Sequence, residues 1–348
     1  MTTFLDAVKG GLALLSLCGL ISCVTIENTY EPSDAEEQLP AVPVEQEHSV
    51  ANSDSEAFVI PEEVDDNMVY IPDTESAPGP VTERARAERE VASNPYVITA
   101  HKHNYFLPVS FTTRLNEEIY QQNDVRLREG LIPTEVQFQI SLKNQLNEKD
   151  LLFKDDALSL GITIEAWWQL YSDDLSSPFR ETNYQPEVFY TAPLSSRLFG
   201  GGIATLFGLE HQSNGQVQGL SRSWNRLYAG LIYEKGSKVV GFRTWYRIPE
   251  KAKSSPDEAD GDDNPNILDY MGYGELSFSI RDAGLEYAAK VRANPSTGRG
   301  AIELGLTYPL FSRFRGFVKY FNGYGESLIE YDHFQQRIGV GVALTSLY

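Results

Sequence analysis

The chain has 348 residues, 41% of them hydrophobic, which is enough for one large domain and a tail. Its formal net charge is −20, but residues 24–93 hold 18 Asp or Glu against three Arg, a balance of −15 within that one segment. The rest of the sequence is nearly balanced and shows no basic footprint, so composition excludes a nucleic-acid-binding protein.

Residues 1–23 have the pattern of an export signal. Lys9 precedes the apolar run "GGLALLSLCGLIS", which has signal-peptide length and is short for a membrane-spanning helix. The run ends in "LISC", which resembles a bacterial lipoprotein cleavage box and would make Cys23 the lipidated first residue; the alternative is an ordinary signal peptide cut nearby. Cys18 and Cys23 are the two cysteines, so no disulfide framework or cysteine metal site is predicted after residue 23.

Residues 24–93 are rich in Glu, Asp, Pro, Ser and Ala. Such a segment buries too little apolar surface to offset the entropy of ordering it, so a disordered acidic linker is predicted. Within it, "VTERARAERE" could form a short helix.

From residue 94 to 348 the sequence alternates between apolar and polar residues. In "ALSLGITIEAWWQL" every even position from Leu158 to Leu170 is apolar, and in "RIGVGVALTSLY" the even positions are apolar except Ser346. Alternation with one apolar face, aromatic residues at strand ends and a final Tyr348 favour a transmembrane β-barrel, in which every backbone group can be paired. A soluble β-sandwich is the alternative. About twelve segments follow the pattern: 96–105, 134–144, 157–171, 185–195, 202–213, 221–234, 237–248, 267–280, 283–293, 299–308, 312–322 and 335–347.

The stretch "EHQSNGQVQGLSRSWNRLY", residues 210–228, places polar residues on an otherwise apolar strand face. Side chains alternate along a strand, so His211 and Ser213 share the face of Phe207 and Leu209, which is the lipid face of a barrel. A hairpin centred near Gln218 would pair His211 with Asn225 and Ser213 with Ser223, at Cβ separations of about 4.5–5.5 Å.

These residue types form a nucleophile, a base and an orienting group. Ser213 is the candidate nucleophile, His211 its general base and Asn225 the group that orients the imidazole. An amide is suited to a lipid-facing site, where an isolated carboxylate would be costly to desolvate. The Gly215 amide is a candidate oxyanion donor, and Ser221 beside turn carbonyls offers oxygen ligands to Ca²⁺. A lone histidine is more often structural; four polar residues interrupting a lipid-facing surface favour the site.

An acidic gap, "PEKAKSSPDEADGDDNP", separates two predicted strands at residues 249–265. Its carboxylates could bind a cation, although a solvated acidic loop is the simpler interpretation. The residues concerned are Asp257, Asp260, Asp262 and Asp263.

Four separated segments resemble the outer membrane phospholipase A family of Gram-negative bacteria, and the similarity covers roughly residues 94–348. They are "HQSNGQVQGLSRSWNRLY", "WWQLYSDDLSSPFRETNYQPEVF", "DDNPNILDYMGY" and "NGYGESLIEYDHFQQRIGVGV". The resemblance implies a twelve-stranded outer-membrane barrel, active as a homodimer, that uses Ca²⁺ to hydrolyse acyl esters of phospholipids and lysophospholipids.

The resemblance also implies site residues. It places the nucleophile on Ser213, the base on His211, the orienting amide on Asn225 and the oxyanion amide on Gly215. For calcium it implies the Ser221 hydroxyl, the main-chain carbonyl of Gln216 and a main-chain oxygen of Ser176 of the partner subunit.

Three departures from the family pattern occur. Gln216 and Gln218 stand where the family usually has Arg and Asp, and Ile164 stands near a usual Gln of the dimer-facing strand. A carbonyl ligand survives a side-chain change, whereas the loss of Asp at 218 weakens a second calcium site shared with Asp262 and Asp263. The alternative to the enzyme is a non-enzymatic barrel, either a channel or a structural protein, with Glu210, Arg222 and Arg226 in its lumen.

Overall fold

The computed structural model describes residues 78–348 except 124–126, 128–129, 256–257, 259–260, 312–313 and 347–348. The predicted signal peptide with Cys23, most of the predicted linker, Asp257, Asp260 and Tyr348 lie outside the described residues.

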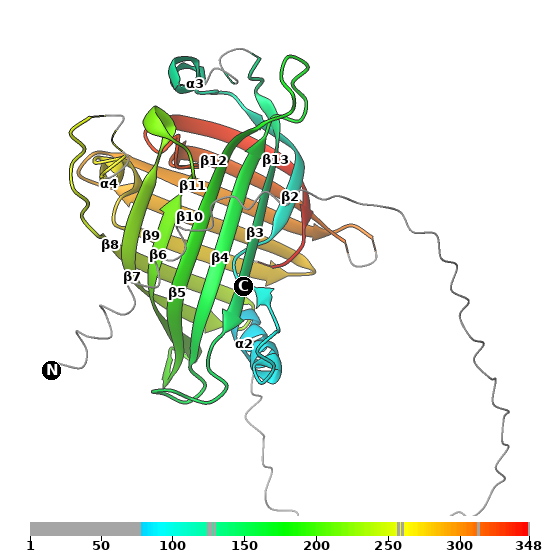
Figure 1. Cartoon of the computed structure of the whole chain (residues 1–348). Coiled ribbons are helices and arrows are strands. Elements are labelled where there is room, and N and C mark those ends of the chain that lie inside the picture. The colour runs from blue at the N-terminus through cyan, green and yellow to red at the C-terminus, as the bar shows by residue number, and fades with distance from the viewer. Residues whose placement is uncertain are drawn as a thin grey trace, which may run out of the picture. The chain divides into compact units, whose positions relative to one another are not determined.

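Twelve antiparallel strands close into a barrel, as the alternation predicted (Figure 1). Each strand pairs with its neighbour in sequence, β13 pairs with β2, and β1 (Thr99–Ala100) adds two residues beside β3. The twelve are β2 (Tyr105–Thr112), β3 (Thr134–Gln145), β4 (Ala157–Trp168), β5 (Phe179–Leu198), β6 (Gly201–Ser213), β7 (Ser223–Lys235), β8 (Lys238–Arg247), β9 (Gly274–Asp282), β10 (Leu285–Asn294), β11 (Arg299–Pro309), β12 (Arg315–Tyr324) and β13 (Phe334–Ala343).

Apolar side chains face outward from the barrel and polar ones face inward. On β4, Leu160 and Ile162 are exposed, whereas Ser159 and Thr163, which flank this pair, are buried. A bilayer would cover the exposed apolar residues, so the surface that looks unfavourable in water fits a lipid environment. Among the described residues, no helix is long and apolar enough to cross a membrane.

Buried ion pairs fill part of the lumen. The Arg180 guanidinium contacts Glu135 Oε1 at 2.8 Å and Glu330 Oε1 at 3.1 Å, and Arg337 reaches Glu135 at 2.7 Å and Glu326 at 2.7 Å. All five side chains are at most 1% exposed at their charged ends. Buried charges need partners of this kind, because an unpaired one would carry the full desolvation penalty.

The connection between β12 and β13 contributes apolar residues to the same interior. Ile329 is fully buried, Leu328 is 2% exposed, and the Leu328 amide donates to Asn183 Oδ1 at 2.9 Å. Leu328 belongs to a buried apolar cluster with Trp224, Trp245 and Ile267. Side chains rather than an open bore therefore occupy this part of the lumen.

Helices lie at both ends of the barrel. Figure 1 shows α3 (Glu117–Asn123) and α4 (Ile267–Met271) at one end and α2 (Pro80–Val91) at the other. The N-terminus of α2 meets Glu234, whose carboxylate accepts from the Val81 amide and the Thr82 hydroxyl, each at 2.5 Å. A carboxylate is stabilising there because the first helical amides lack partners within the helix.

Three predicted boundaries differ from the structure. Residues 80–91, placed in the linker where "VTERARAERE" was expected to form a short helix, do form the helix α2 rather than a disordered segment. A carboxylate on β7 and an ion pair between Lys143 and Glu88 at 2.8 Å hold it against the barrel. The first strand is β2 rather than 96–105, where only the two residues of β1 are paired. The predicted strand 267–280 begins with α4, and β9 starts at Gly274.

Candidate active site

The hairpin of β6 and β7 has the predicted register. His211 lies opposite Asn225 and Ser213 opposite Ser223. The outward face carries these residues above Phe207 and Leu227, which are each 51% exposed, whereas Glu210 is 1% exposed and faces inward. The structure therefore places His211, Ser213 and Asn225 on the outward side of the hairpin together with Ser223, whereas Ser221, the fourth polar residue of the prediction, precedes β7.

Inward side chains hold this register from the lumen. Gln212 Oε1 accepts from the Trp224 indole at 2.9 Å and from Arg226 Nη2 at 3.2 Å. Arg226 also pairs with Glu210 and stacks over the Trp224 ring at 3.9 Å. A slip by one residue would exchange the two faces, so these buried contacts fix which side chains reach the outer surface.

His211 and Asn225 are joined by a hydrogen bond. His211 Nδ1 lies 2.9 Å from Asn225 Oδ1, and both residues are half-buried. An amide oxygen can only accept, so Nδ1 carries the proton in this contact. In the neutral ring, Nε2 is then the unprotonated nitrogen that can accept a proton from a nucleophile.

Ser213 lies two residues beyond His211 on the same strand face and opposite Tyr184 on β5. Within the described part of the chain, the hydrogen bonds of this face do not include one between Ser213 and His211. A nucleophile and its base are often loosely spaced without substrate, so the shared face is the relevant observation.

The loop after Ser213 is organised by Asn214, which is 3% exposed. Its Oδ1 accepts from the Arg222 amide at 2.9 Å, and its Nδ2 donates to the Leu220 carbonyl at 2.8 Å. Gly215 follows in the left-handed region with φ of 63°, which a glycine adopts without strain. This turn places the Gly215 amide and Gln216 next to Ser213.

Ser221 faces an acidic residue of the β8–β9 connection. Its hydroxyl donates to Asp263 Oδ2 at 2.7 Å, and Asp263 also pairs with Lys253. Asp262 pairs with Arg247 at 2.5 Å. Each described aspartate of the predicted cation cluster therefore has a basic partner. No group of three or more His, Cys, Asp or Glu side chains suited to a metal occurs among the residues that the structure describes.

The same β8–β9 connection contacts the hairpin at three further points that the sequence did not reveal. The Ile248 amide donates to the Asn225 carbonyl at 2.8 Å, Asn225 Nδ2 donates to Glu250 Oε1 at 2.9 Å, and the Ser223 amide donates to Asn264 Oδ1 at 3.1 Å. The acidic composition of the segment was visible, but nothing in its spacing identified which carboxylate reaches Asn225.

The remaining predicted residues lie on the neighbouring strands. Ser176 is exposed in the connection between β4 and β5. Ile164 stands on β4 between Ile140 of β3 and Tyr184 of β5. Both residues lie outside the β6–β7 hairpin. Among the described residues of the single chain, Ser176 makes no hydrogen bond with Ser221.

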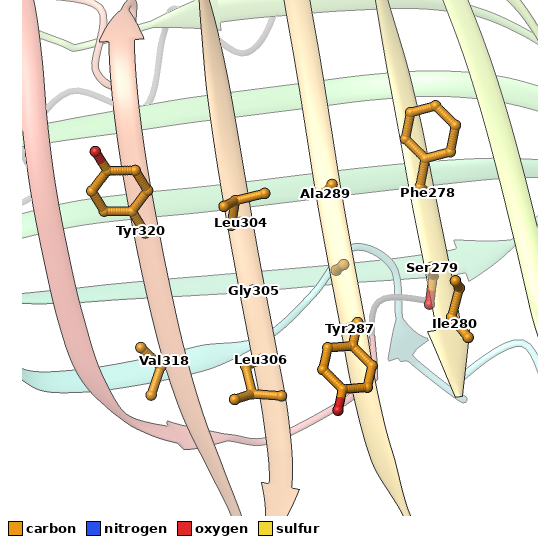
Figure 2. A pocket seen from close by; sticks show the side chains of 11 residues that line it. Phe278, Ser279, Ile280, Tyr287, Ala289, Leu304, Gly305, Leu306, Val318 and Tyr320 are labelled. Atoms are coloured by element: carbon orange, nitrogen blue, oxygen red, sulfur yellow. The ribbon is translucent and has the colours of Figure 1, made fainter. Parts of the chain in front are cut away.

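Two apolar depressions mark the outer surface. One of about 390 Å³ is lined by residues of β4–β7, including Phe207 and Leu227, on the strands that carry His211 and Asn225. The other, of about 400 Å³, crosses β9–β12 and is lined by Phe278, Tyr287, Leu304 and their neighbours (Figure 2). Only the first lies on the strands with the polar cluster.

Comparison with known proteins agrees with this geometry. The model of the phospholipase A1 family matches residues 81–344. The chain is 37% identical over 256 residues to phospholipase A1 of Escherichia coli strain K12, covering 73% of this chain and 84% of that protein. It is likewise 37% identical over 262 residues to phospholipase A1 of Proteus vulgaris, with the same coverage of each chain.

Solved structures show the same likeness. Outer membrane phospholipase A from Escherichia coli superposes with a TM-score of 0.68 at 35% identity, covering 76% of this chain and 98% of that one. The same values describe the Salmonella typhi outer membrane phospholipase, a dimer with bound calcium. One Escherichia coli structure is an active-site mutant in which Asn is replaced by Ala. The chain is an outer-membrane β-barrel that belongs to the phospholipase A1 family.

Proposed function

We propose that this barrel is a calcium-dependent phospholipase whose Ser213, His211 and Asn225 hydrolyse acyl esters at the outer face of the barrel. The observation that carries the proposal is the hydrogen bond of 2.9 Å between His211 Nδ1 and Asn225 Oδ1, on the face that Ser213 shares. Family membership supplies the reaction class, and the active-site asparagine of the Escherichia coli enzyme supports the role of Asn225.

The reaction would follow the nucleophile–base pattern. Ser213 Oγ attacks the acyl carbonyl carbon while His211 Nε2 takes the hydroxyl proton, and Asn225 stabilises the resulting imidazolium. His211 then returns that proton to the oxygen of the departing lysolipid. Water, deprotonated by His211, attacks the acyl-serine ester, which releases the fatty acid and restores Ser213.

Calcium fits the oxygen donors of the hairpin. Ser221 Oγ and Asp263 Oδ2 face each other at 2.7 Å, and hydroxyl, carboxylate and carbonyl oxygens are the ligands that Ca²⁺ prefers. Ser221 and the main-chain carbonyl of Gln216 would hold the ion, which would supply positive charge for the developing oxyanion. The Gly215 amide, in the same turn, would donate the second contact to that oxygen.

The outward position of the site suits a substrate that stays in the membrane. His211 and Ser213 continue the apolar face of Phe207, and the depression along Phe207 and Leu227 offers an apolar surface to an acyl chain. A phospholipid or lysophospholipid could therefore reach Ser213 from the surrounding leaflet without entering the lumen.

A homodimer would complete the calcium ligands. Ser176 is exposed, so a main-chain oxygen of Ser176 of the partner subunit could approach the Ser221 side of the hairpin. The calcium-bound dimer of the Salmonella typhi enzyme supports this arrangement. Activity should rise steeply with the ratio of protein to detergent when calcium is present. A cross-linking series that shows a fully active monomer would contradict the dimer.

Fatty-acid release from mixed micelles tests the proposal. Wild type with calcium should be active, whereas Ser213→Ala and a chelated wild-type sample should both lose activity. Ser279→Ala, on the inner face of β9, is the matched control and should remain active. Equal rates in all samples would reject the proposed chemistry, and ion conductance without hydrolysis would favour the alternative of a channel.

A further inference from the structure

We propose that Glu250 is a positioning residue of this site, which orients the Asn225 amide and thereby selects the tautomer of His211. This inference deepens the proposed function and rests on it. It concerns a residue of the β8–β9 connection that follows β8 and precedes the acidic stretch containing Asp262 and Asp263.

Three contacts form a continuous chain from the loop to the imidazole. Glu250 Oε1 accepts from Asn225 Nδ2 at 2.9 Å, and Asn225 Oδ1 lies 2.9 Å from His211 Nδ1. The Ile248 amide donates to the Asn225 carbonyl at 2.8 Å, which extends the pairing of β7 with β8 and holds the loop beside Asn225. The backbone next to Glu250 is therefore bonded to the backbone of Asn225, whose side-chain amide Glu250 orients.

The orientation of Asn225 needs such a partner because the two ends of an amide have nearly the same shape. With Oδ1 toward His211, the imidazole must carry its proton on Nδ1, and Nε2 is free to accept the Ser213 proton. With Nδ2 toward His211, the amide would donate to Nδ1, the proton would move to Nε2, and the base would be blocked.

A carboxylate removes this ambiguity. Ionised Glu250 has acceptors and no donors, so only the Nδ2 end of Asn225 can bond to it. The Oδ1 end must then face His211. The two hydrogen bonds of Asn225 therefore support each other, and losing the one to Glu250 would release the amide rather than remove a remote contact.

Glu250 also places a negative charge near the base without placing it in the lipid-facing strand. It is half-buried beyond the end of β8, where water can reach part of the carboxylate. The charged or titratable groups near it are Arg247, Asp262 and His211. Burial raises the pKa of the Glu250 carboxyl, and the hydrogen bond from Asn225 opposes that rise by stabilising the charged form.

Two substitutions separate orientation from charge. Glu250→Ala removes both and should lower kcat about tenfold with little change in KM, the effect of losing one hydrogen bond to a charged group. Glu250→Gln keeps an acceptor for Asn225 Nδ2 but adds a donor that also permits the flipped amide, so its kcat should lie between those of wild type and Glu250→Ala.

A matched control lies in the same loop. Glu258 accepts from the Ser254 amide at 2.6 Å, and among the described residues it makes no hydrogen bond or ion pair with the hairpin. Glu258→Gln should leave both kcat and KM unchanged. Retention of the barrel's heat-sensitive shift on electrophoresis would establish that each variant is folded.

A double-mutant cycle decides the mechanism. In an Asn225→Ala background, Glu250→Ala should cause no further loss, because there is no amide left to orient. Additive losses, or wild-type kcat in Glu250→Ala, would overturn the positioning role. If instead Ser213→Ala hydrolysed phospholipid at the wild-type rate, the proposed function itself would fail, so the two failures are distinguishable.

Discussion

Two walls of the barrel, β4–β7 and β9–β12, present apolar outer faces with depressions of nearly equal size, about 390 and 400 Å³. On β9–β12 the labelled side chains in Figure 2 are mostly aliphatic or aromatic and span four neighbouring strands. On β6–β7 the apolar face ends in His211, Ser213 and Asn225, and His211 is hydrogen-bonded to Asn225.

The comparison shows that an apolar depression on the lipid-facing surface does not by itself identify a catalytic site. Both walls can accommodate a hydrocarbon, and both carry polar groups in contact, since Asn322 donates to Tyr320 on β12. Among the described residues of these two walls, the pairing of a histidine with an amide beside a serine occurs on β6–β7. A polar residue facing lipid is costly unless it has a partner, so hydrogen bonding is expected wherever such residues occur. The informative feature is the kind of groups that are paired: a base and an orienting amide next to a hydroxyl on β6–β7. The experiments below compare changes on the β6–β7 wall with matched changes elsewhere in the barrel.

The largest difference between the walls is expected for His211→Ala. Removing the base should lower kcat about 10³-fold or more, because the serine hydroxyl is a weak nucleophile without it. Tyr287→Ala, an outward-facing change on β10, should leave kcat within about twofold. Micelle hydrolysis of both variants tests this, and a comparable loss in Tyr287→Ala would end the distinction between the walls.

The lumen behind both walls should govern stability. Arg180→Leu leaves Glu135 and Glu330 with one basic partner fewer in a fully buried setting, and the free energy of unfolding should fall by about 3–5 kcal/mol. Arg86→Leu, on the exposed face of α2, should change it by about 0.5 kcal/mol or less. Urea titration in lipid vesicles measures both. Equal stability of the two variants would show that the ion pairs contribute little.

Asn225→Ala should have an intermediate effect on activity. The imidazole keeps its place on β6 but loses the group that fixes its tautomer, so kcat should fall about 10- to 100-fold. Asn322 on β12 is the matched residue, since its Nδ2 also donates across the surface, to Tyr320 at 3.3 Å. Asn322→Ala should hydrolyse micellar phospholipid normally, and a loss in that variant equal to the Asn225→Ala loss would show a general effect of removing amides.

The alternation of side chains made most of the barrel predictable. A period of two assigns the outer face of β6 and β7 directly, and one register follows once Ser213 is paired with Ser223. Contacts between residues far apart in the sequence were harder to predict. The short helix of α2 could be expected from residues 81–90, but its docking on Glu234, which is 153 residues from Val81, could not, because no local pattern contains that contact.

The candidate site divides in the same way. His211, Ser213 and Asn225 could be identified because strand geometry alone brings them together. Asp263 was named as a candidate cation ligand, but its contact with Ser221 was not predicted, and neither were the contacts of Glu250 and Asn264 with the hairpin. These three residues belong to an irregular connection whose path depends on the contacts it makes. The acidic composition predicted a charged loop, but it did not predict that Lys253 and Arg247 would pair with its aspartates.

The smallest expected effect concerns that loop and calcium. Lys253 pairs with Asp263, which accepts from Ser221, so its ammonium lies beside the oxygens proposed to attract Ca²⁺. Lys253→Met should remove a competing positive charge and strengthen calcium binding about three- to tenfold, with a larger effect at low ionic strength. Lys251→Met, an exposed change in the same loop, should have less effect. Calorimetric titration of Ca²⁺ into each micellar variant measures the affinity directly. Unchanged or weaker binding in Lys253→Met would mean that Lys253 supports the loop rather than competing with the ion.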